Sequence, residues 1–273
     1  MEYLSLPSGF SFSQSSLQDY YECPRRFQLR YIQRLQWPAV DTEPVQENER
    51  RQQEGQAFHL MIQQRLIGLP VEKLGQNANT PDLSRWWGNF LETKLELPGY
   101  NQHIEITLVA PVGNYRLLAK YDLVSIKSHE RVLIYDWKTY HKRPRDEWMI
   151  AHLQTRVYRA LLVQTGACLN SGSLFLPEQI TMVYWYANFP SEPAVFPYNT
   201  AQFNNDWEAL TVLINEISNH RHFPMTEDEK KCTYCPYRSY CNRGCTAGTQ
   251  TNYADPESFL GEITFEQIPE LEF

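Results

Sequence analysis

The sequence of this 273-residue chain predicts an α/β fold. Three observations support that prediction. Apolar residues recur at helical spacing through most of the N-terminal third, β-rich runs replace them between residues 103 and 139, and a helix followed by a strand is predicted after residue 140. A strand meander, a helix and a further strand form an α/β core, with more helices before and after it.

Three helical regions are predicted before the strands, at residues 13–37, 55–68 and 82–97. The first begins with serines that suit a helix N-cap, and Cys23 and Pro24 divide it because proline fits the first turn of a new helix. The second ends at Gly68. Residues 38–54 are polar with mixed charge, so we expect a mobile connection there.

The strands and the later helices follow from a change of period at residue 103. The segment 103–139 holds three β-rich runs separated by turn residues, which is typical of an antiparallel meander. Residues 145–166 are predicted to form one helix, residues 179–187 a strand and residues 200–220 a last helix. The predicted parts are a helical segment (1–100), the core (101–190), a C-terminal helix with a cysteine cluster (191–245) and an acidic tail (246–273).

Composition limits what the protein can be. Hydrophobic residues make up 42% of the chain, which is enough for a packed core, and no apolar run reaches membrane-spanning length. The N-terminus lacks the pattern of a secretory signal, so we expect a cytoplasmic protein. The acidic tail contributes −6 to the net charge of −7, which leaves −1 for residues 1–245 and is compatible with a nucleic-acid partner.

Two carboxylates and a lysine form the most informative pattern. Asp136 and Lys138 are two residues apart in a predicted strand, so their side chains point to the same side of the sheet. Asp122 lies in the neighbouring predicted strand and can come alongside them. Carboxylates suit Mg²⁺, and a lysine can assist a metal-bound water or neutralise charge on a phosphate. Taken alone, Asp136 and Lys138 are explained as well by a salt bridge.

The order of several short motifs is more specific than that pair. "GQAFH" on a predicted helix is followed by "AKYD" and "IYDWKT" on predicted strands and by "QTRVY" on a helix. This series resembles the PD-(D/E)XK nucleases of the RecB type, which include AddB and the CRISPR-associated exonucleases. The resemblance implies a restriction-endonuclease-like mixed sheet flanked by helices. It also implies a metal-dependent DNA nuclease, an exonuclease with roles in repair, recombination or CRISPR-type processing.

The resemblance assigns roles to individual residues. It makes Asp122, Asp136 and Lys138 catalytic, and it implies that Mg²⁺ or Mn²⁺ is bound by His59, Asp122, Asp136 and the backbone carbonyl of Trp137. Gln154 and Tyr158 match residues that support the site and the nucleic-acid strand. Glu105, on an earlier strand, is expected to be structural or hydrogen-bonding. The chain departs from the family at Ala119 and Tyr140, where many members have glycine.

Six cysteines in a chain expected to lie in a reducing compartment indicate metal binding rather than disulfides. Cys232, Cys235 and Cys241 are closely spaced, and either Cys23 or Cys245 can supply a fourth thiolate. Four thiolates suit both structural zinc and an iron-sulfur cluster. The resemblance implies a 4Fe-4S cluster held by Cys23 and the three later cysteines, which would join the N- and C-terminal helical segments.

DNA contacts are predicted from charge and aromatic residues. Lys142 and Arg143 follow the site strand directly, and the earlier candidates are Arg25, Arg26, Arg30 and Arg34; base stacking is expected from Trp137, Tyr140 or Trp148. The sequence carries no G-x-x-x-x-G-K-[ST] motif, so any helicase would be a separate partner protein. The alternatives are a non-catalytic DNA-binding or assembly subunit and a zinc-stabilised interaction protein.

Overall fold

The computed structural model describes residues 6–7, 9–36, 43–93, 95, 99–127 and 130–244. The chain forms two compact units. The sheet unit contains residues 53–111 and 117–210, and the cysteine unit contains residues 1–52, 112–116 and 211–273. Cys245 and the acidic tail lie outside the described residues, and the division of the chain at residues 100, 190 and 245 stays a prediction.

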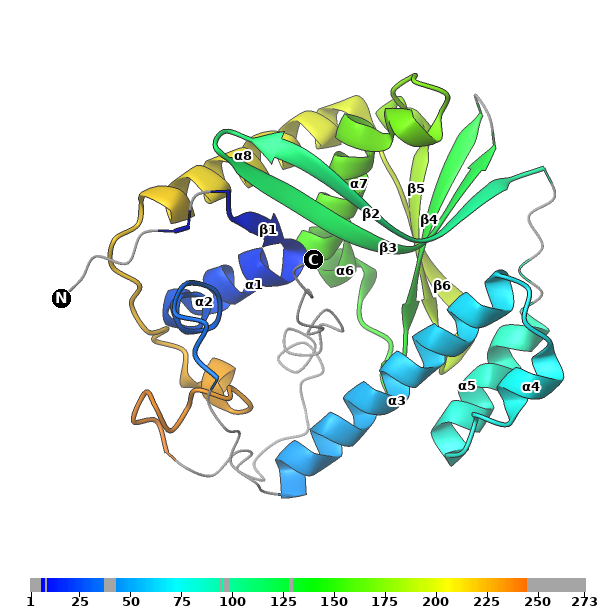
Figure 1. The fold of residues 1–273 in the computed structure, drawn as a ribbon, viewed down its shortest axis with the longest axis horizontal. Helices are drawn as coiled ribbons and strands as arrows, with labels where there is room; N and C mark the ends of the chain where they lie inside the picture. Colours follow the sequence, from blue (N-terminus) through cyan, green and yellow to red (C-terminus); the bar gives the residue numbers. More distant parts are fainter. Residues whose placement is uncertain are drawn as a thin grey trace. The chain divides into compact units, whose positions relative to one another are not determined.

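The elements follow the predicted order (Figure 1). The strands are β1 (Ser11–Ser13), β2 (Asn101–Val112), β3 (Tyr115–Lys127), β4 (Arg131–Lys138), β5 (Ile180–Tyr186) and β6 (Phe189–Pro197). The helices are α1 (Gln14–Glu22), α2 (Pro24–Phe27), α3 (Glu43–Leu66), α4 (Val71–Gly75), α5 (Pro81–Glu92), α6 (Asp146–Ala151), α7 (Leu153–Thr165) and α8 (Thr200–Asn219). Short helical turns are η1 (Gln28–Ile32), η2 (Gly166–Leu169), η3 (Pro177–Gln179) and η4 (Glu229–Cys232). Within the described ranges, no helix has the length and apolar character needed to span a bilayer.

The sheet unit is built on a mixed sheet. Strand β2 pairs with β3, β3 runs antiparallel to β4, β4 runs parallel to β5, and β5 runs antiparallel to β6. A parallel pair requires a crossover between its strands, and α6 and α7 occupy the connection from β4 to β5. The predicted mixed α/β fold with flanking helices is therefore confirmed.

Helices α3, α4 and α5 cover one face of this sheet. Phe58 from α3 and Trp86 and Phe90 from α5 pack in one buried cluster with Trp137 of β4 and Trp185 of β5. Trp137 therefore points into the core, and strand alternation turns its neighbours Asp136 and Lys138 to the opposite face, toward α7. The aromatic cluster fixes the face on which the site is built.

The structure corrects three sequence-based expectations. The connection predicted at residues 38–54 is wrong from residue 43 onward, because α3 begins at Glu43. Strand β6 and the short helix α4 were not predicted. The single helix expected at residues 145–166 is two helices, because His152 is extended (φ −63°, ψ 142°) and its Nδ1 accepts a hydrogen bond from the Gln154 backbone N–H at 3.3 Å. His152 is thus the N-cap of α7.

The cysteine unit joins segments from both ends of the described chain. Pro24 starts α2, as predicted. Phe27 packs against Phe10, Tyr20 and Phe223, and the Arg25 backbone N–H donates to the Pro224 carbonyl at 3.0 Å. The N-terminal helices are therefore held to the segment that leads to the cysteines by an aromatic core of their own.

Phe58→Ala tests the core of the sheet unit. Phe58 is fully buried, so its removal should lower the free energy of unfolding by about 3 to 5 kcal/mol. Leu60→Ala, at a 51% exposed position on the same helix, is the matched control and should change it by less than about 0.5 kcal/mol. Equal losses in the two variants, measured by urea denaturation, would contradict this packing.

Candidate active site

Asp136 and Lys138 form a buried ion pair at the end of β4. Lys138 Nζ lies 2.8 Å from Asp136 Oδ2, and both side chains are buried. Burying two charges is costly unless they are paired and further hydrogen-bonded. The salt bridge between Asp136 and Lys138, which the sequence allowed as a simple explanation of this pair, is therefore present. The groups around it determine whether the pair can also take part in chemistry.

Gln154 holds both members of this ion pair. Its Oε1 accepts a hydrogen bond from Lys138 Nζ at 2.8 Å, and its Nε2 donates to Asp136 Oδ1 at 2.6 Å. A carboxamide has an acceptor and a donor on one group, so it can serve an ammonium and a carboxylate at once. A glutamate at this position would place a second carboxylate against Asp136. The first turn of α7, capped by His152, positions Gln154.

Asp122 and His59 form a second pair beside the first. His59 Nδ1 on α3 lies 3.3 Å from Asp122 Oδ2 on β3, and the same oxygen accepts a hydrogen bond from the Trp137 backbone N–H at 2.9 Å. The bond to Trp137 links β3 to β4 beyond their last paired residues, Leu123 and Tyr135. The structure thus brings together His59, Asp122, Asp136, Lys138 and Gln154.

The electrostatics of the two carboxylates differ. Burial alone would raise the pKa of Asp122, but His59, the Trp137 backbone N–H and Lys138 bring it below its usual value. Burial and the nearby charge of Asp122 raise the pKa of Asp136 to about 6, against the opposing effect of Lys138. Burial would lower the pKa of His59, but Asp122 and then Asp136 raise it. The charged form of Asp136 is therefore disfavoured at this site, and a nearby cation would stabilise it.

Lys138 is held as an ammonium ion. Burial would lower its pKa, but Asp136 and the neighbouring Tyr140 and Tyr184 raise it well above the usual lysine value. Its Nζ lies 5.3 Å from the ring centroid of Tyr184 and 5.9 Å from that of Tyr140, within cation-π range. A lysine held in this state can stabilise negative charge but is poorly suited to accept a proton.

Glu105 adds a third carboxylate near the site. Its Oε2 lies 2.7 Å from Lys120 Nζ, in agreement with the expected structural or hydrogen-bonding role. Burial raises its pKa, and the charge of Asp122 acts in the same direction. Its backbone has φ of 53° within β2, a left-handed conformation that costs about 1 to 3 kcal/mol in a residue other than glycine. Such strain is typical of functional regions.

The donor types at this site fit a divalent metal ion, although the side chains are not arranged as a complete site. Two buried carboxylates and an imidazole are ligands that Mg²⁺ or Mn²⁺ accepts. Across the described residues, no three His, Cys, Asp or Glu side chains are grouped so that they could hold an ion. Lys138 pairs with Asp136 instead. Metal binding at His59, Asp122 and Asp136 therefore requires these side chains to shift.

The residues predicted to support the site or contact DNA differ in their surroundings. Tyr158 is buried, and its ring packs 4.8 Å from that of Tyr121, so it supports α7 from within. Arg143 donates to the carbonyls of Glu192 and Pro144 and pairs with Asp146, which favours a structural role. Lys142 is exposed.

Base stacking by Trp137 and Tyr140 is contradicted, because both side chains are buried. Trp148 is partly exposed, and its ring lies 4.8 Å from that of His152. Phosphate contacts by Arg26 and Arg30 are also contradicted, because both guanidinium groups pair with Asp19.

Two residues around the site, Tyr184 and His152, were missed from the sequence. Tyr184 lies opposite Asp136 in the parallel β4 and β5 register, and its hydroxyl is 2.8 Å from that of Thr155. His152 caps the helix that carries Gln154. Tyr184 lay in a predicted strand, but only the β4 and β5 pairing places it beside Lys138. The helix break at His152 had no glycine or proline to mark it.

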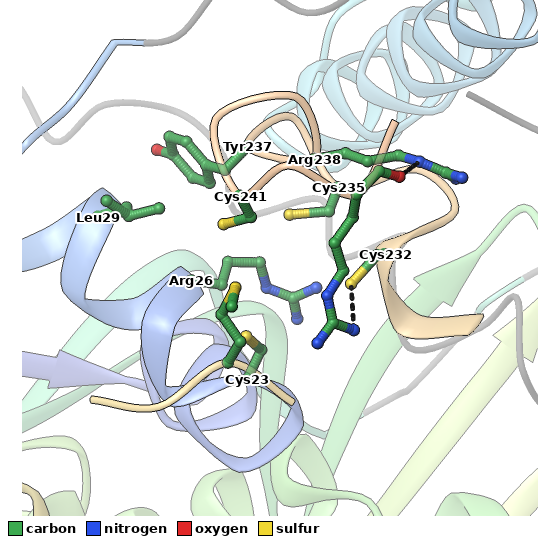
Figure 2. Close-up of a pocket in the computed structure, with 10 residues that line it drawn as sticks. Cys23, Arg26, Leu29, Cys232, Cys235, Tyr237, Arg238 and Cys241 are labelled. Atoms are coloured by element: carbon green, nitrogen blue, oxygen red, sulfur yellow. Dashed lines mark hydrogen bonds between the residues drawn. The ribbon is translucent and has the colours of Figure 1, made fainter. Parts of the chain in front are cut away.

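Four cysteines line one pocket in the cysteine unit (Figure 2). Cys23 comes from the start of α2, and Cys232, Cys235 and Cys241 come from the C-terminal segment. Arg243 Nη1 lies 3.8 Å from Cys232 Sγ. Burial raises the pKa of Cys232, and Arg243 opposes that rise while Cys23 adds to it. The choice between Cys23 and Cys245 as the fourth ligand stays a prediction, because Cys245 lies outside the described residues.

Comparisons with known proteins define the class. A model of the PD-(D/E)XK nuclease superfamily matches residues 11–242. The chain therefore belongs to the PD-(D/E)XK nuclease superfamily, and it is a nuclease. Nucleases of this superfamily typically use divalent metal ions such as Mg²⁺ or Mn²⁺. The RecB-type subgroup stays a prediction.

Solved structures give a broader similarity. The crystal structure of a "Putative exonuclease" from Eubacterium rectale has a TM-score of 0.51 and 6% sequence identity, and the match covers 79% of this chain and 84% of that chain. The crystal structure of SSO0001 has a TM-score of 0.40 and 14% identity, with 86% and 87% covered. The first shows a shared fold. No curated protein matches this chain.

Gln154→Leu tests the bridge between Asp136 and Lys138. The variant removes two hydrogen bonds from buried charged groups, so we expect a loss of about 2 to 4 kcal/mol in the free energy of unfolding. Gln164→Leu, at an exposed position on the same helix, is the matched control. If both variants unfold at the same denaturant concentration as the unchanged protein, the bridge is not a stabilising element.

Proposed function

We propose that this nuclease is a metal-dependent DNA exonuclease that hydrolyses phosphodiester bonds at the site formed by Asp122, Asp136 and Lys138. The observation that carries the proposal is the buried Asp136, Lys138 and Gln154 network beside the Asp122 and His59 pair. Buried charges whose pKa values are strongly shifted, lying on neighbouring strands of a nuclease fold, are typical of a catalytic centre.

His59, Asp122, Asp136 and the backbone carbonyl of Trp137 would hold Mg²⁺ or Mn²⁺. The bound ion would polarise a phosphate oxygen and make water a stronger nucleophile. Support comes from the negative charge of Asp122, which together with burial raises the pKa of Asp136 and so disfavours its charged form. A cation bound there would remove that repulsion and release Lys138 from Asp136.

Lys138 would then act on the substrate. Its raised pKa keeps it positively charged, so it would stabilise the negative charge that develops on the phosphate during hydrolysis. Gln154 would keep the ammonium in place, because its Oε1 accepts from Lys138 Nζ while its Nε2 holds Asp136. Gln154 is thus a positioning residue, and Tyr158 supports the helix that carries it.

DNA would approach over the segment that follows β4. Lys142 is exposed there and would contact the phosphate backbone. Arg143 bonds to the Glu192 carbonyl and pairs with Asp146, so it would stabilise the conformation of this segment. The biological setting that we propose is DNA repair, recombination or CRISPR-type processing. Duplex unwinding would come from a separate helicase.

We further propose that Cys23, Cys232, Cys235 and Cys241 hold a 4Fe-4S cluster. Support comes from the four cysteines sharing one pocket, where Arg243 opposes the rise in the pKa of Cys232 that burial causes (Figure 2). Among the described residues, no group of three or more His, Cys, Asp or Glu side chains is placed so that it could hold a metal ion, so cluster binding requires the cysteine side chains to move. Structural zinc in the same four-cysteine site is the alternative, because four thiolates suit either group.

Cleavage assays test the active site. Asp136→Ala and Lys138→Ala should each lower the cleavage rate of end-labelled single- and double-stranded DNA at least about 100-fold in Mg²⁺ or Mn²⁺. Glu208→Ala and Lys73→Ala, both exposed, are the matched controls and should cleave normally. Cleavage by Asp136→Ala and Lys138→Ala at the control rate would refute this site. A wild-type protein that binds DNA without cutting it would point to a non-catalytic subunit.

Cys232→Ser tests the cysteine site. A link between residues 23 and 232 closes a loop of roughly 210 residues, worth up to about 5 kcal/mol in the crosslink model, so the variant should melt at a clearly lower temperature. Anaerobically purified wild type should contain iron and absorb visible light, and Cys232→Ser should lose both. Cys168→Ser, at an exposed cysteine outside the pocket, is the control. A Cys232→Ser variant that melts at the wild-type temperature would exclude a stabilising link. Wild-type protein that contains zinc but no iron would show that the site binds zinc instead of a cluster.

A further inference from the structure

The cysteine unit carries two exposed tyrosines, each beside a cation. Tyr21 is 70% exposed, and Lys231 Nζ lies 5.9 Å from its ring centroid. Tyr240 is 40% exposed, and the Arg25 guanidinium carbon lies 5.8 Å from its ring centroid. Large aromatic side chains exposed to this extent lose the stabilisation that burial would give them, which makes their position informative.

These pairs lie next to the pocket cysteines in the sequence. Tyr21 and Arg25 stand two residues before and two after Cys23. Lys231 directly precedes Cys232, and Tyr240 directly precedes Cys241. Each pair therefore spans the N-terminal helices and the C-terminal segment where the two meet. We call Tyr21, Arg25, Lys231 and Tyr240 the rim tyrosine surface.

Charge around this surface favours an anionic partner. The C-terminal segment at residues 221–243 carries five basic residues against three acidic ones, a balance of +2, in a chain whose net charge is −7. The acidic residues Asp19 and Glu22 on α1 are paired with Arg26, so they contribute little net charge. The rim tyrosine surface thus combines exposed aromatic faces with excess positive charge.

We propose that the rim tyrosine surface binds single-stranded nucleic acid, with bases stacking on Tyr21 and Tyr240 and phosphates meeting Lys231 and Arg25. Unpaired bases have free faces that stack on aromatic rings regardless of sequence, whereas the bases of a duplex are covered by their neighbours. This inference rests on the proposed function only in taking DNA as the substrate. It gives the cysteine unit a role in holding the strand.

Binding of a fluorescent oligothymidylate of about 20 nucleotides, followed by anisotropy in EDTA, tests this proposal. Tyr21→Ala and Tyr240→Ala should each weaken binding about 5- to 30-fold, while Tyr21→Phe and Tyr240→Phe should stay within about twofold of wild type, since phenylalanine keeps the ring. Leu176→Ala, at a 63% exposed position in the sheet unit, should bind normally. Lys231→Gln should reduce the slope of affinity against salt by about one ionic contact.

The outcomes separate this proposal from the cleavage mechanism. Unchanged affinity in both alanine variants would overturn the rim tyrosine surface, and so would equal losses with alanine and phenylalanine. A loss of affinity for duplex DNA as large as that for the single strand would overturn the stacking role. Because EDTA prevents metal-dependent cleavage, a protein that binds through these tyrosines but never cuts would refute the proposed hydrolysis alone. Melting temperature and metal content check that each variant is folded.

Discussion

The buried contact between Lys138, Asp136 and Gln154 is the interaction on which the sheet unit's chemistry depends. An ammonium ion in a protein interior needs a carboxylate and further acceptors, and here one carboxamide serves both charges. That requirement explains the surrounding architecture. Strand β4 must present Asp136 and Lys138 on the face opposite Trp137. Helix α7 must begin at Leu153, so that Gln154 lies in its first turn.

The two units contain different kinds of potential metal-binding side chains. The sheet unit gathers carboxylates, an imidazole and a lysine, which suit hard cations and phosphate. The cysteine unit gathers thiols, which suit soft metals, with arginines beside them. Each has its own aromatic core, built around Trp137 in one and Phe27 in the other. Each centre is therefore supported by packing within its own unit.

Much of the fold could be predicted because its signals are local. The period change at residue 103, the alternation through Asp136 and Lys138, and Pro24 at a helix start are all visible in short stretches of sequence. The break at His152 could not be predicted, because the histidine is an unusual N-cap and no glycine or proline marks it. Its capping bond forms only when the two helices separate.

The candidate site was predictable in its residues but less so in their contacts. The order of the motifs predicted that five residues share one site: His59, Asp122, Asp136, Lys138 and Gln154. In the structure, His59 contacts Asp122, and Asp136, Lys138 and Gln154 contact one another. Tyr184 was missed because its place beside Lys138 depends on the parallel register of β4 and β5. Arg26 and Arg30 were wrongly predicted to contact phosphates, because their partner Asp19 lies on a separate helix, α1. A single sequence does not show which residues of separate helices and strands pair with one another.

The composition of the cysteine unit has a consequence for how the protein is made. Its N-terminal helices are translated before the sheet unit, whereas Phe223 and the cysteines from residue 232 onward are translated after it. Domains generally fold as units during synthesis, so the sheet unit at residues 53–210 is available to fold while Phe27 and Cys23 still lack their partners. The pocket therefore cannot form until the cysteines from residue 232 onward have been translated.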